Sequence, residues 1–421
     1  MKFNKWTLGL AAIGAVSLAS VAQAEEKSSS VLTAVSSTVL SGYVDTSAQW
    51  NIGTGNSHAP AYKYGGSTKA DGFNLNAVEL TLQKPLDEAE WAAGYRADLL
   101  FGPDANMFPF GIGTTSSGIS ISDLAIKQAY VALRAPVGNG LDFKVGVFDS
   151  IIGYESTESI NNPNFTRSWG HTIEPSTQTG ILSTYRLNNN VAFAAGVANT
   201  ESAIINSRAF PTVNPLTSGT KAESYKTYMG SIALTAPDDW GFVSGSSLYG
   251  GVINGFNNAQ RANQTSWYAG ATVATPVTGL RVGAAYDYAG ISGQPVGNGI
   301  PARISPAFAN AAALYTSFQA TEKLSLHARG EYATFSPALI SGFQNNGFGV
   351  AGRMLALTGT IQYDLWKNVI SRLEFRWDHA LDGSEAFGGN GPSVFAGNGE
   401  TISTGNRKNS YILVANFSYK F

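Results

Sequence analysis

The chain has 421 residues, of which only 13% are charged, and its 27 basic and 29 acidic side chains leave it close to neutral. Near-neutrality argues against a nucleic-acid partner, because such proteins need a basic surface. Cysteine is absent, which excludes a disulfide framework and thiol chemistry. The 47 glycines, 18 tyrosines and 22 phenylalanines favour many strands joined by flexible loops over a helical fold.

The N-terminus has the three parts of a secretory signal. Lys2 and Lys5 precede an apolar run of about fifteen residues, and Ala22-Gln23-Ala24 supplies the small-x-small pattern of a signal peptidase site. An uncleaved membrane anchor is the alternative, but this run is shorter than the ~20 residues that a spanning helix needs. We therefore predict a signal peptide at residues 1–24, cleaved after Ala24, and a polar lead-in at residues 25–37.

From Thr38 to the C-terminus, apolar and polar residues alternate with a period of two, which is the pattern of strands with one apolar face. The clearest example is SRLEFRWD at residues 371–378, where charged residues alternate with Leu, Phe and Trp. Strands of this kind also occur in soluble sheets. The connections between the strands therefore decide the class of fold.

Short and long connections alternate along the chain. About seven are tight-turn sequences, among them PLDEAE, PVGNG, NNN, PVTG and WKN, and about eight are polar loops of roughly ten to thirty residues. An even strand number, short turns at one end, long loops at the other and outward aromatic residues are features of an outer-membrane barrel. We predict an all-β fold, a transmembrane antiparallel barrel of about sixteen strands at residues 38–421, in the outer membrane of a Gram-negative-type bacterium.

The last predicted strand ends on an aromatic residue. Tyr411, Leu413, Phe417 and Tyr419 occupy alternate positions before Phe421, and we expect them to face lipid. This ending resembles the C-terminal signature by which Gram-negative barrels are passed to the barrel-assembly machinery. The resemblance implies that Phe421 is an assembly signal, whereas a secreted β-sandwich that ends on Phe by chance is the alternative.

Residues 142–185 carry a more specific pattern. It consists of Gly146-x-Phe148, Tyr154-Glu155, the Asn-Pro-Asn-Phe segment at 162–165, Pro175 and Gly180. Together with NAVELTLQKP, GYRADLLFGPDA and IKQAYVALRAP, this pattern resembles the OmpL-like β-barrel porins over nearly the whole mature chain. The resemblance implies a passive channel for small hydrophilic solutes, surrounded by outer-membrane lipid and lipopolysaccharide, and it suggests a homotrimer.

A barrel of about sixteen strands encloses a lumen that side chains cannot fill, so inward charges would line water and determine which solutes pass. Two arrangements of these charges stay open. Opposite charges form neutral ladders along the wall, or Arg329, Arg372 and Arg376 form a basic stripe that faces acids on an inward loop. The candidate pore-lining residues are Arg96, Asp98, Arg281, Asp287, His327, Arg329, Glu331, Arg372, Glu374, Arg376 and Asp378.

The third long loop, residues 151–176, is the candidate constriction. The third loop of sixteen-stranded general porins folds inward, and by analogy Glu155, Glu158 and Arg167 would supply the charges here. Phe165 and Trp169 would anchor the loop. A loop that stays outside the barrel is the alternative. The number of acidic and basic residues is too nearly equal to indicate which ions would pass.

Enzyme chemistry has little support in the sequence. Ser325 and His327 share an inward face, but their Cα atoms would lie ~7 Å apart along the strand, which is unsuited to a nucleophile–base pair. His58, His171 and His379 fall in or beside loops without an evident partner. No metal or nucleotide motif is present, so we predict no enzyme activity, no metal and no cofactor. A surface interaction or structural protein that acts through its long extracellular loops is the alternative function.

Overall fold

The computed structural model describes residues 31–32, 38–53, 55–66, 69–107, 123–201, 203–209, 225–257, 262–292, 306–340, 348–389, 393–395, 401–403 and 405–421. The predicted signal peptide, its cleavage position after Ala24 and most of the lead-in lie outside these residues. No helix within the described ranges is long and apolar enough to cross a membrane.

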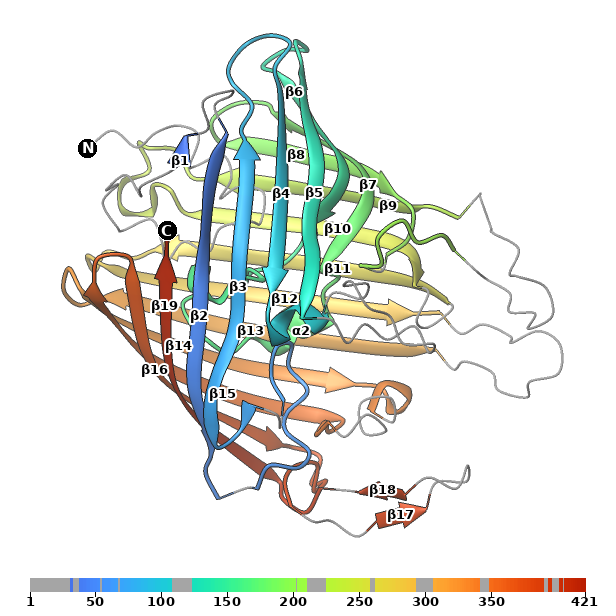
Figure 1. Ribbon diagram of the computed structural model, residues 1–421, viewed down its shortest axis with the longest axis vertical. Coiled ribbons are helices and arrows are strands. Elements are labelled where there is room, and N and C mark those ends of the chain that lie inside the picture. Colours follow the sequence, from blue (N-terminus) through green and yellow to red (C-terminus); the bar gives the residue numbers. More distant parts are fainter. Residues whose placement is uncertain are drawn as a thin grey trace, which may run out of the picture.

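Sixteen strands of the described chain close into an antiparallel barrel, which confirms the predicted fold (Figure 1). Each strand pairs with its neighbour in the chain, and β19 pairs with β2 to complete the ring. The barrel strands are β2 (Val39–Asn51), β3 (Gly72–Lys84), β4 (Ala93–Phe101), β5 (Leu124–Ala135), β6 (Leu141–Asp149), β7 (Thr177–Arg186), β8 (Val191–Ala198), β9 (Thr227–Thr235), β10 (Ser247–Asn257), β11 (Ala262–Ala274), β12 (Leu280–Ile291), β13 (Ala307–Gln319), β14 (Leu324–Phe335), β15 (Arg353–Trp366), β16 (Val369–Ala380) and β19 (Asn409–Lys420).

The remaining elements are small. Strand β1 (Val31–Leu32) pairs with the start of β2, and β17 (Ser393–Phe395) pairs with β18 (Thr401–Ser403) in a separate ribbon. Helices among the described residues include η3 (Pro103–Met107), η4 (Ser159–Asn161), α2 (Trp169–Ile173) and η5 (Gly241–Val243), and residues 337–340 are also helical. Of these, η4 and α2 belong to the β6–β7 connection.

The predicted alternation is visible in β16. The outward Phe375 side chain is 45% exposed, whereas the inward Glu374 and Arg376 are at most 1% exposed. The closing strand β19 behaves in the same way, with Phe417 exposed and Val414 buried. Both strands therefore present an apolar face to the membrane, and the four charged residues Arg372, Glu374, Arg376 and Asp378 of β16 lie inside the ring.

The short turns lie where the sequence predicts them. The tightest joins β15 to β16 through residues 367–368, where Asn368 has φ 63°. Asparagine tolerates this left-handed conformation better than most residues, which is why it suits a two-residue hairpin. On the opposite side, the connection between β10 and β11, residues 258–261, is much shorter than the roughly ten to thirty residues expected of the outer loops.

Two β-bulges reverse the inward and outward faces within their strands. In β3, Asn76 is skipped where Asp45 pairs with Ala77 and Thr46 pairs with Leu75. In β5, Lys127 is skipped in the same way opposite β4. A bulge inserts one extra residue on one strand, so the alternation continues with the opposite parity beyond it.

Candidate functional site: a loop bonded inside the barrel

The connection between β6 and β7, residues 150–176, lies inside the ring of strands; we call it loop 3 (Figure 1). Trp169, the first residue of α2, is completely buried, and Asn164 is nearly so. Ser168 caps α2, because its side chain accepts a hydrogen bond from the His171 N–H at 2.9 Å. The loop contains η4 and α2, and its anchors are the inward charges of the wall.

Arg329 on β14 holds the centre of loop 3. Its guanidinium donates to Glu155 Oε1 at 2.8 Å and to the Thr166 carbonyl oxygen at 2.7 Å. It also donates to Glu331 Oε2 at 2.7 Å along its own strand. The other Glu155 oxygen accepts the Ser168 N–H at 2.7 Å, so one carboxylate links the wall to the start of α2.

Glu374 on β16 binds the loop backbone directly. One carboxylate oxygen accepts the Phe165 N–H at 2.5 Å, and the other accepts the Thr166 N–H at 2.8 Å. The Thr360 hydroxyl donates to the same carboxylate at 2.7 Å. Hydrogen bonds to an ionised acceptor are about twice as strong as neutral ones, so this carboxylate is a strong anchor for the loop.

Trp169 is fixed from two strands. Its backbone N–H donates to Glu331 Oε1 at 2.5 Å, and its indole Nε1 donates to Asp378 Oδ1 at 2.9 Å. Arg376 pairs with Asp378 at 2.7 Å and donates to the Arg167 carbonyl oxygen at 2.6 Å. The wall therefore has ladders of opposite charge along its strands and, through the same residues, bonds to the loop. Of the three arginines of the hypothetical basic stripe, Arg329 faces a loop acid, Glu155, whereas Arg372 and Arg376 donate to loop carbonyl oxygens.

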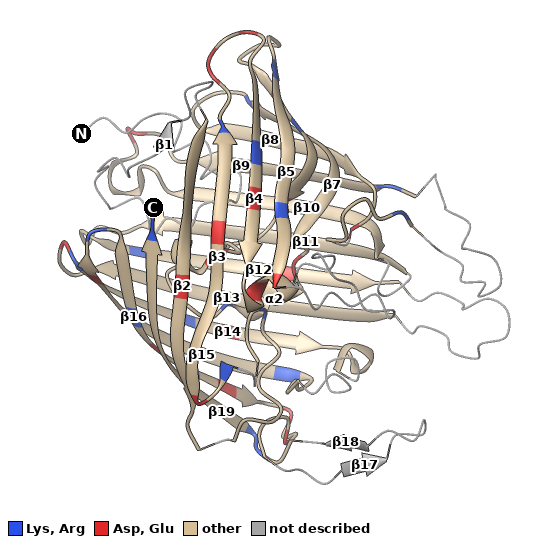
Figure 2. Cartoon of the chain, viewed as in Figure 1, with Lys and Arg blue, Asp and Glu red and all other residues tan. Residues whose placement is uncertain are grey.

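The beginning of loop 3 is bonded to β16 and β2, the two strands on either side of the closing strand β19. Arg372 donates to the Ser159 carbonyl oxygen at 3.0 Å, and the Ser159 hydroxyl donates to Asp45 Oδ2 on β2 at 2.9 Å. Glu158 forms an ion pair with Lys127, the bulged residue of β5. Figure 2 shows charged residues of both signs within β3, β4 and β5, on the wall that faces this part of the loop.

The β2–β3 connection also reaches this site. The Arg376 guanidinium lies 4.0 Å from the centre of the Tyr62 ring, and the Arg167 guanidinium lies 4.9 Å from the centre of the Tyr64 ring. Both tyrosines are buried. Cation–π contacts of this kind stabilise a desolvated guanidinium, so residues 61–64 take part in fixing loop 3.

The end of loop 3 is bonded to a buried lysine, Lys63, of the β2–β3 connection. Lys63 Nζ donates to the Glu174 carbonyl oxygen at 2.6 Å and to Ser176 Oγ at 3.1 Å. The carboxyl of Glu174 lies near Asp287 of β12, and a Cβ on Gly170 would collide with the Asp287 carboxylate. The α2 backbone and two carboxyl groups therefore meet at this point of the wall.

Burial dominates the ionisation of these loop groups. It raises the pKa of Glu174 well above 4.5, and Asp287 raises that pKa further by repulsion. Burial lowers the pKa of Lys63 to about 8 and holds the pKa of His171 well below 6.5. His171 Nδ1 lies 3.3 Å from Glu174 Oε2, and at neutral pH it is uncharged.

The other predicted pore residues lie away from loop 3. Arg96 pairs with Asp98 at 2.8 Å on β4. Arg281 is half-buried near the short-turn end of β12. His327 Nδ1 lies 2.9 Å from Ser317 Oγ on β13, so its hydroxyl partner is Ser317 and not Ser325. Within the described chain, no carboxylate forms a hydrogen bond with the His327 ring.

His379 at the outer end of β16 is hydrogen-bonded to Asn409 at 2.8 Å. The described residues contain no group of three His, Cys, Asp or Glu side chains arranged to hold a metal ion. The geometry therefore assembles anchors for a loop, and the histidines form no nucleophile–base–acid arrangement in the described chain.

Several residues of the site had no clear sequence signal. Lys127 and Glu79 have uncertain faces by alternation alone, because the bulges at Lys127 and Asn76 change the parity of their strands. Lys63 and Glu174 lie in loops, where no periodicity applies. The one available signal was their charge, and charge alone does not distinguish an inward loop residue from a solvated one.

This closed ring of sixteen strands, with short turns at one end and an inward loop, defines the class of outer-membrane β-barrel porins. The family described as "Putative beta-barrel porin-2, OmpL-like" matches residues 37–407. The chain belongs to this family of porins and is an outer-membrane protein. No curated protein matches the chain.

Solved structures of outer-membrane channels share the fold at low sequence identity. The outer membrane channel DcaP of Acinetobacter baumannii is 13% identical, with a TM-score of 0.56, and the match covers 93% of this chain and 99% of that one. The anion-selective porin of Comamonas acidovorans is 12% identical, with a TM-score of 0.54, over 91% and 99% of the two chains. OmpT of Vibrio cholerae, in a trimer form, is 10% identical, with a TM-score of 0.51, over 91% and 99%.

Proposed function

We propose that the protein is a passive diffusion channel for small hydrophilic solutes or ions, and that loop 3 forms its constriction. The observation that carries this proposal is the bonding of Glu155, Thr166 and Trp169 to wall residues of β14 and β16. A loop bonded across the interior reduces the free cross-section of a sixteen-stranded barrel, which would otherwise leave a wide aqueous lumen. Passage would then depend on solute size and on the charges beside the loop.

The charges support a filter for polar solutes. Arg329, Arg376 and their carboxylate partners lie on one side of the interior, opposite the Lys127–Glu158 pair. Fixed charges of both signs in a narrow passage orient polar solutes and disfavour apolar ones, because an apolar molecule cannot replace the water that these groups bind. Because the charges are paired, we expect only weak selectivity between cations and anions.

Two measurements test the channel directly. Liposomes that contain the refolded protein should swell in small sugars and progressively less in larger ones. In a planar bilayer with a KCl gradient, Arg281→Glu should move the reversal potential toward cations, because Arg281 is inward and lies away from the anchors of loop 3. A folded barrel that admits no solute and gives no current would overturn the proposal and favour a surface interaction or structural protein acting through its outer loops.

We also propose the oligomer and the processing of the chain. The Vibrio cholerae protein of the same fold in a trimer form supports a homotrimer. Native mass spectrometry of protein extracted from membranes should give three copies, whereas a single copy would contradict this proposal. The same sample should begin at Glu25 if residues 1–24 are removed as a signal peptide, and it should retain them if they form an anchor.

A further inference from the structure

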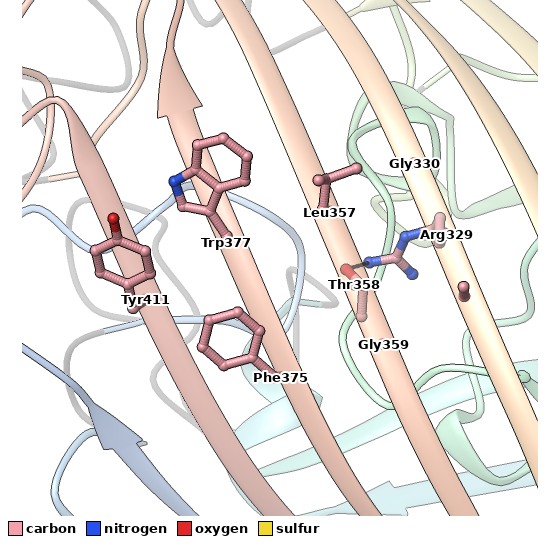
Figure 3. A pocket seen from close by; sticks show the side chains of 9 residues that line it. Arg329, Gly330, Leu357, Thr358, Gly359, Phe375, Trp377 and Tyr411 are labelled. Carbon is pink, nitrogen blue, oxygen red and sulfur yellow. Dashed lines mark hydrogen bonds between the residues drawn. The ribbon is translucent and has the colours of Figure 1, made fainter.

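The membrane-facing surface carries a hollow across β14, β15, β16 and β19. Its volume is about 660 Å³, and Ala328, Gly330 and Gly359 form its floor. Figure 3 shows the Phe375 and Trp377 rings and the Tyr411 ring beside one another, with the Leu357 side chain on the adjacent strand. The lining side chains that point outward are apolar or aromatic, namely Leu357, Phe375, Trp377 and Tyr411.

The packing of the chain does not require the two glycines in this floor. A Cβ on Gly359 would meet no atom within 4 Å, and one on Gly330 would meet only Leu357 Cδ2, at 3.5 Å. Neither residue has a positive φ. Glycine within a strand weakens it and often marks a place where a ligand approaches the backbone. Here it leaves open a space that the Cβ of an alanine would enter without collision.

The hollow extends from the middle of the membrane toward the long loops. On β15, Leu357 and Gly359 are closer to Arg353 at the loop end than to Trp366 at the turn end. In an outer-membrane barrel the long loops are extracellular, so the hollow opens to the outer leaflet. Its environment there is lipid hydrocarbon.

Exposed cations lie where this hollow meets the outer surface. Arg353 begins β15, and Lys408 directly precedes β19; both side chains are exposed. The two strands flank β16, so their axes are ~10 Å apart, and two long side chains can meet over that distance. Arg407 is also exposed next to Lys408.

Two carboxylates share this rim. Asp382 accepts hydrogen bonds from the Gly352 N–H at 2.6 Å and from the Ser384 N–H and hydroxyl at 2.9 and 2.6 Å, so its oxygens are occupied in the turn. Glu385 is exposed. Among the described residues of this rim, three cations stand against two carboxylates, and Asp382, which also accepts a backbone hydrogen bond from Arg353, stays ionised.

We propose that the hollow binds an acyl chain of a phosphorylated outer-leaflet lipid, with its phosphate held by Arg353 and Lys408. The apolar walls fit a hydrocarbon chain. A chain in the hollow makes more van der Waals contacts with the protein than a chain that lies against a flat part of the barrel. Cations at the rim attract an anionic headgroup and give no advantage to a zwitterionic one. This lipid site is separate from the channel interior and does not depend on its conductance.

Native mass spectrometry with added lipid A or phosphatidylcholine tests the site. The wild-type protein should keep lipid A in preference to phosphatidylcholine. Gly359→Leu, which fills the hollow, and the double variant Arg353→Ala/Lys408→Ala, which removes the cations, should each lower lipid A retention by about tenfold. Ala284→Leu is the matched control, because Ala284 is a small exposed residue on the outer face of β12.

Each other result overturns the site. Equal lipid A retention by all four proteins would mean that lipids bind the surface without preference. If Gly359→Leu changes the number of copies and leaves lipid A retention unchanged, a second copy of the chain covers the hollow instead. Heat-modifiable migration on gels reports whether each variant folds. If Gly359→Leu does not fold, Arg353→Ala/Lys408→Ala still tests the site, because both of its substitutions are at exposed positions.

Discussion

Glu374 shows how one residue of the wall positions a loop from a distant part of the sequence. Its two oxygens accept successive backbone N–H groups, those of Phe165 and Thr166, and the Thr166 hydroxyl at 2.5 Å. Backbone donors that enter the barrel interior must find acceptors there, because an unpaired buried N–H costs about as much as a lost hydrogen bond. The Glu374 carboxylate accepts from two backbone N–H groups and one hydroxyl of the loop together.

We expect Glu374→Gln to loosen loop 3 while the barrel stays closed. An amide keeps one acceptor oxygen but loses the charge, so the loop anchor should weaken by about 1–2 kcal/mol. Hydrogen exchange of residues 159–170 should become faster in this variant. Glu385→Gln, at an exposed position outside the barrel, is the control. Unchanged exchange in Glu374→Gln would mean that the carboxylate does not hold the loop.

Glu174 should make the barrel less stable as the pH rises. Its pKa in the folded protein is raised, so the folded state keeps a proton that the unfolded chain releases above about pH 4.5, and stability falls as the pH rises toward the folded value. The effect is at most about 1.4 kcal/mol for each pH unit. Between pH 6.5 and 7.5 the unfolded chain releases the His171 proton and the folded chain begins to release the Lys63 proton. Both raise stability with pH, so the Glu174 contribution is the difference between the wild type and a variant that lacks this carboxyl.

Thermal melts across this pH range provide the measurement. The melting temperature of the wild type should fall with rising pH relative to that of Glu174→Gln, whose amide does not titrate. Asp287 remains in the variant and faces the same position. An equal slope in both proteins would show that another group controls the dependence.

At the scale of single elements, strand positions followed from alternation and turn chemistry, whereas faces near bulges did not. Arg372, Glu374, Arg376 and Asp378 point inward as the pattern of β16 predicts. In β5 the pattern changes at Lys127, because the bulge there depends on the register with β4 and not on any local sequence feature. Register is a relation between two strands, so one strand's sequence cannot specify it.

The closing pair of strands provides a prediction about assembly. Phe421 and Gly42 exchange backbone hydrogen bonds, both at 3.0 Å, beyond the last residue of β19. Deleting Phe421 should cost about 1–2 kcal/mol of stability in the refolded protein through these bonds. We expect a larger, severalfold fall in the amount inserted in the outer membrane of cells, because Phe421 is also the proposed assembly signal.

Outer-membrane fractions, compared with the refolding yield in detergent, separate the two effects. Phe417→Ala is the control, since it removes an exposed aromatic side chain from β19 and keeps the terminal Phe. A deletion that lowers refolding and membrane insertion by the same factor would leave Phe421 with a structural role only.

For the whole molecule, the ring could be predicted but the path of loop 3 could not. Seven turns, eight loops and a repeated apolar face lead to one closed architecture, because a barrel is the sheet that satisfies its backbone in lipid. The inward loop rests on contacts between residues more than 150 positions apart, such as Glu155 with Arg329 and Trp169 with Asp378. Loop 3 and the inner face of the wall each carry charges of both signs, which is consistent with a loop inside or outside the barrel. The sequence alone therefore does not decide between these two positions of the loop.

The central claim is that loop 3, held by the wall, narrows an open channel. Single-channel recording of the wild type, Glu374→Gln and Glu385→Gln in a planar bilayer tests it most directly. We predict discrete conductance steps in all three, with larger and noisier steps in Glu374→Gln alone, because the released loop obstructs less of the lumen. Steps of the same size and noise in all three proteins would contradict the role of loop 3, and a folded wild-type barrel without steps would contradict the channel itself.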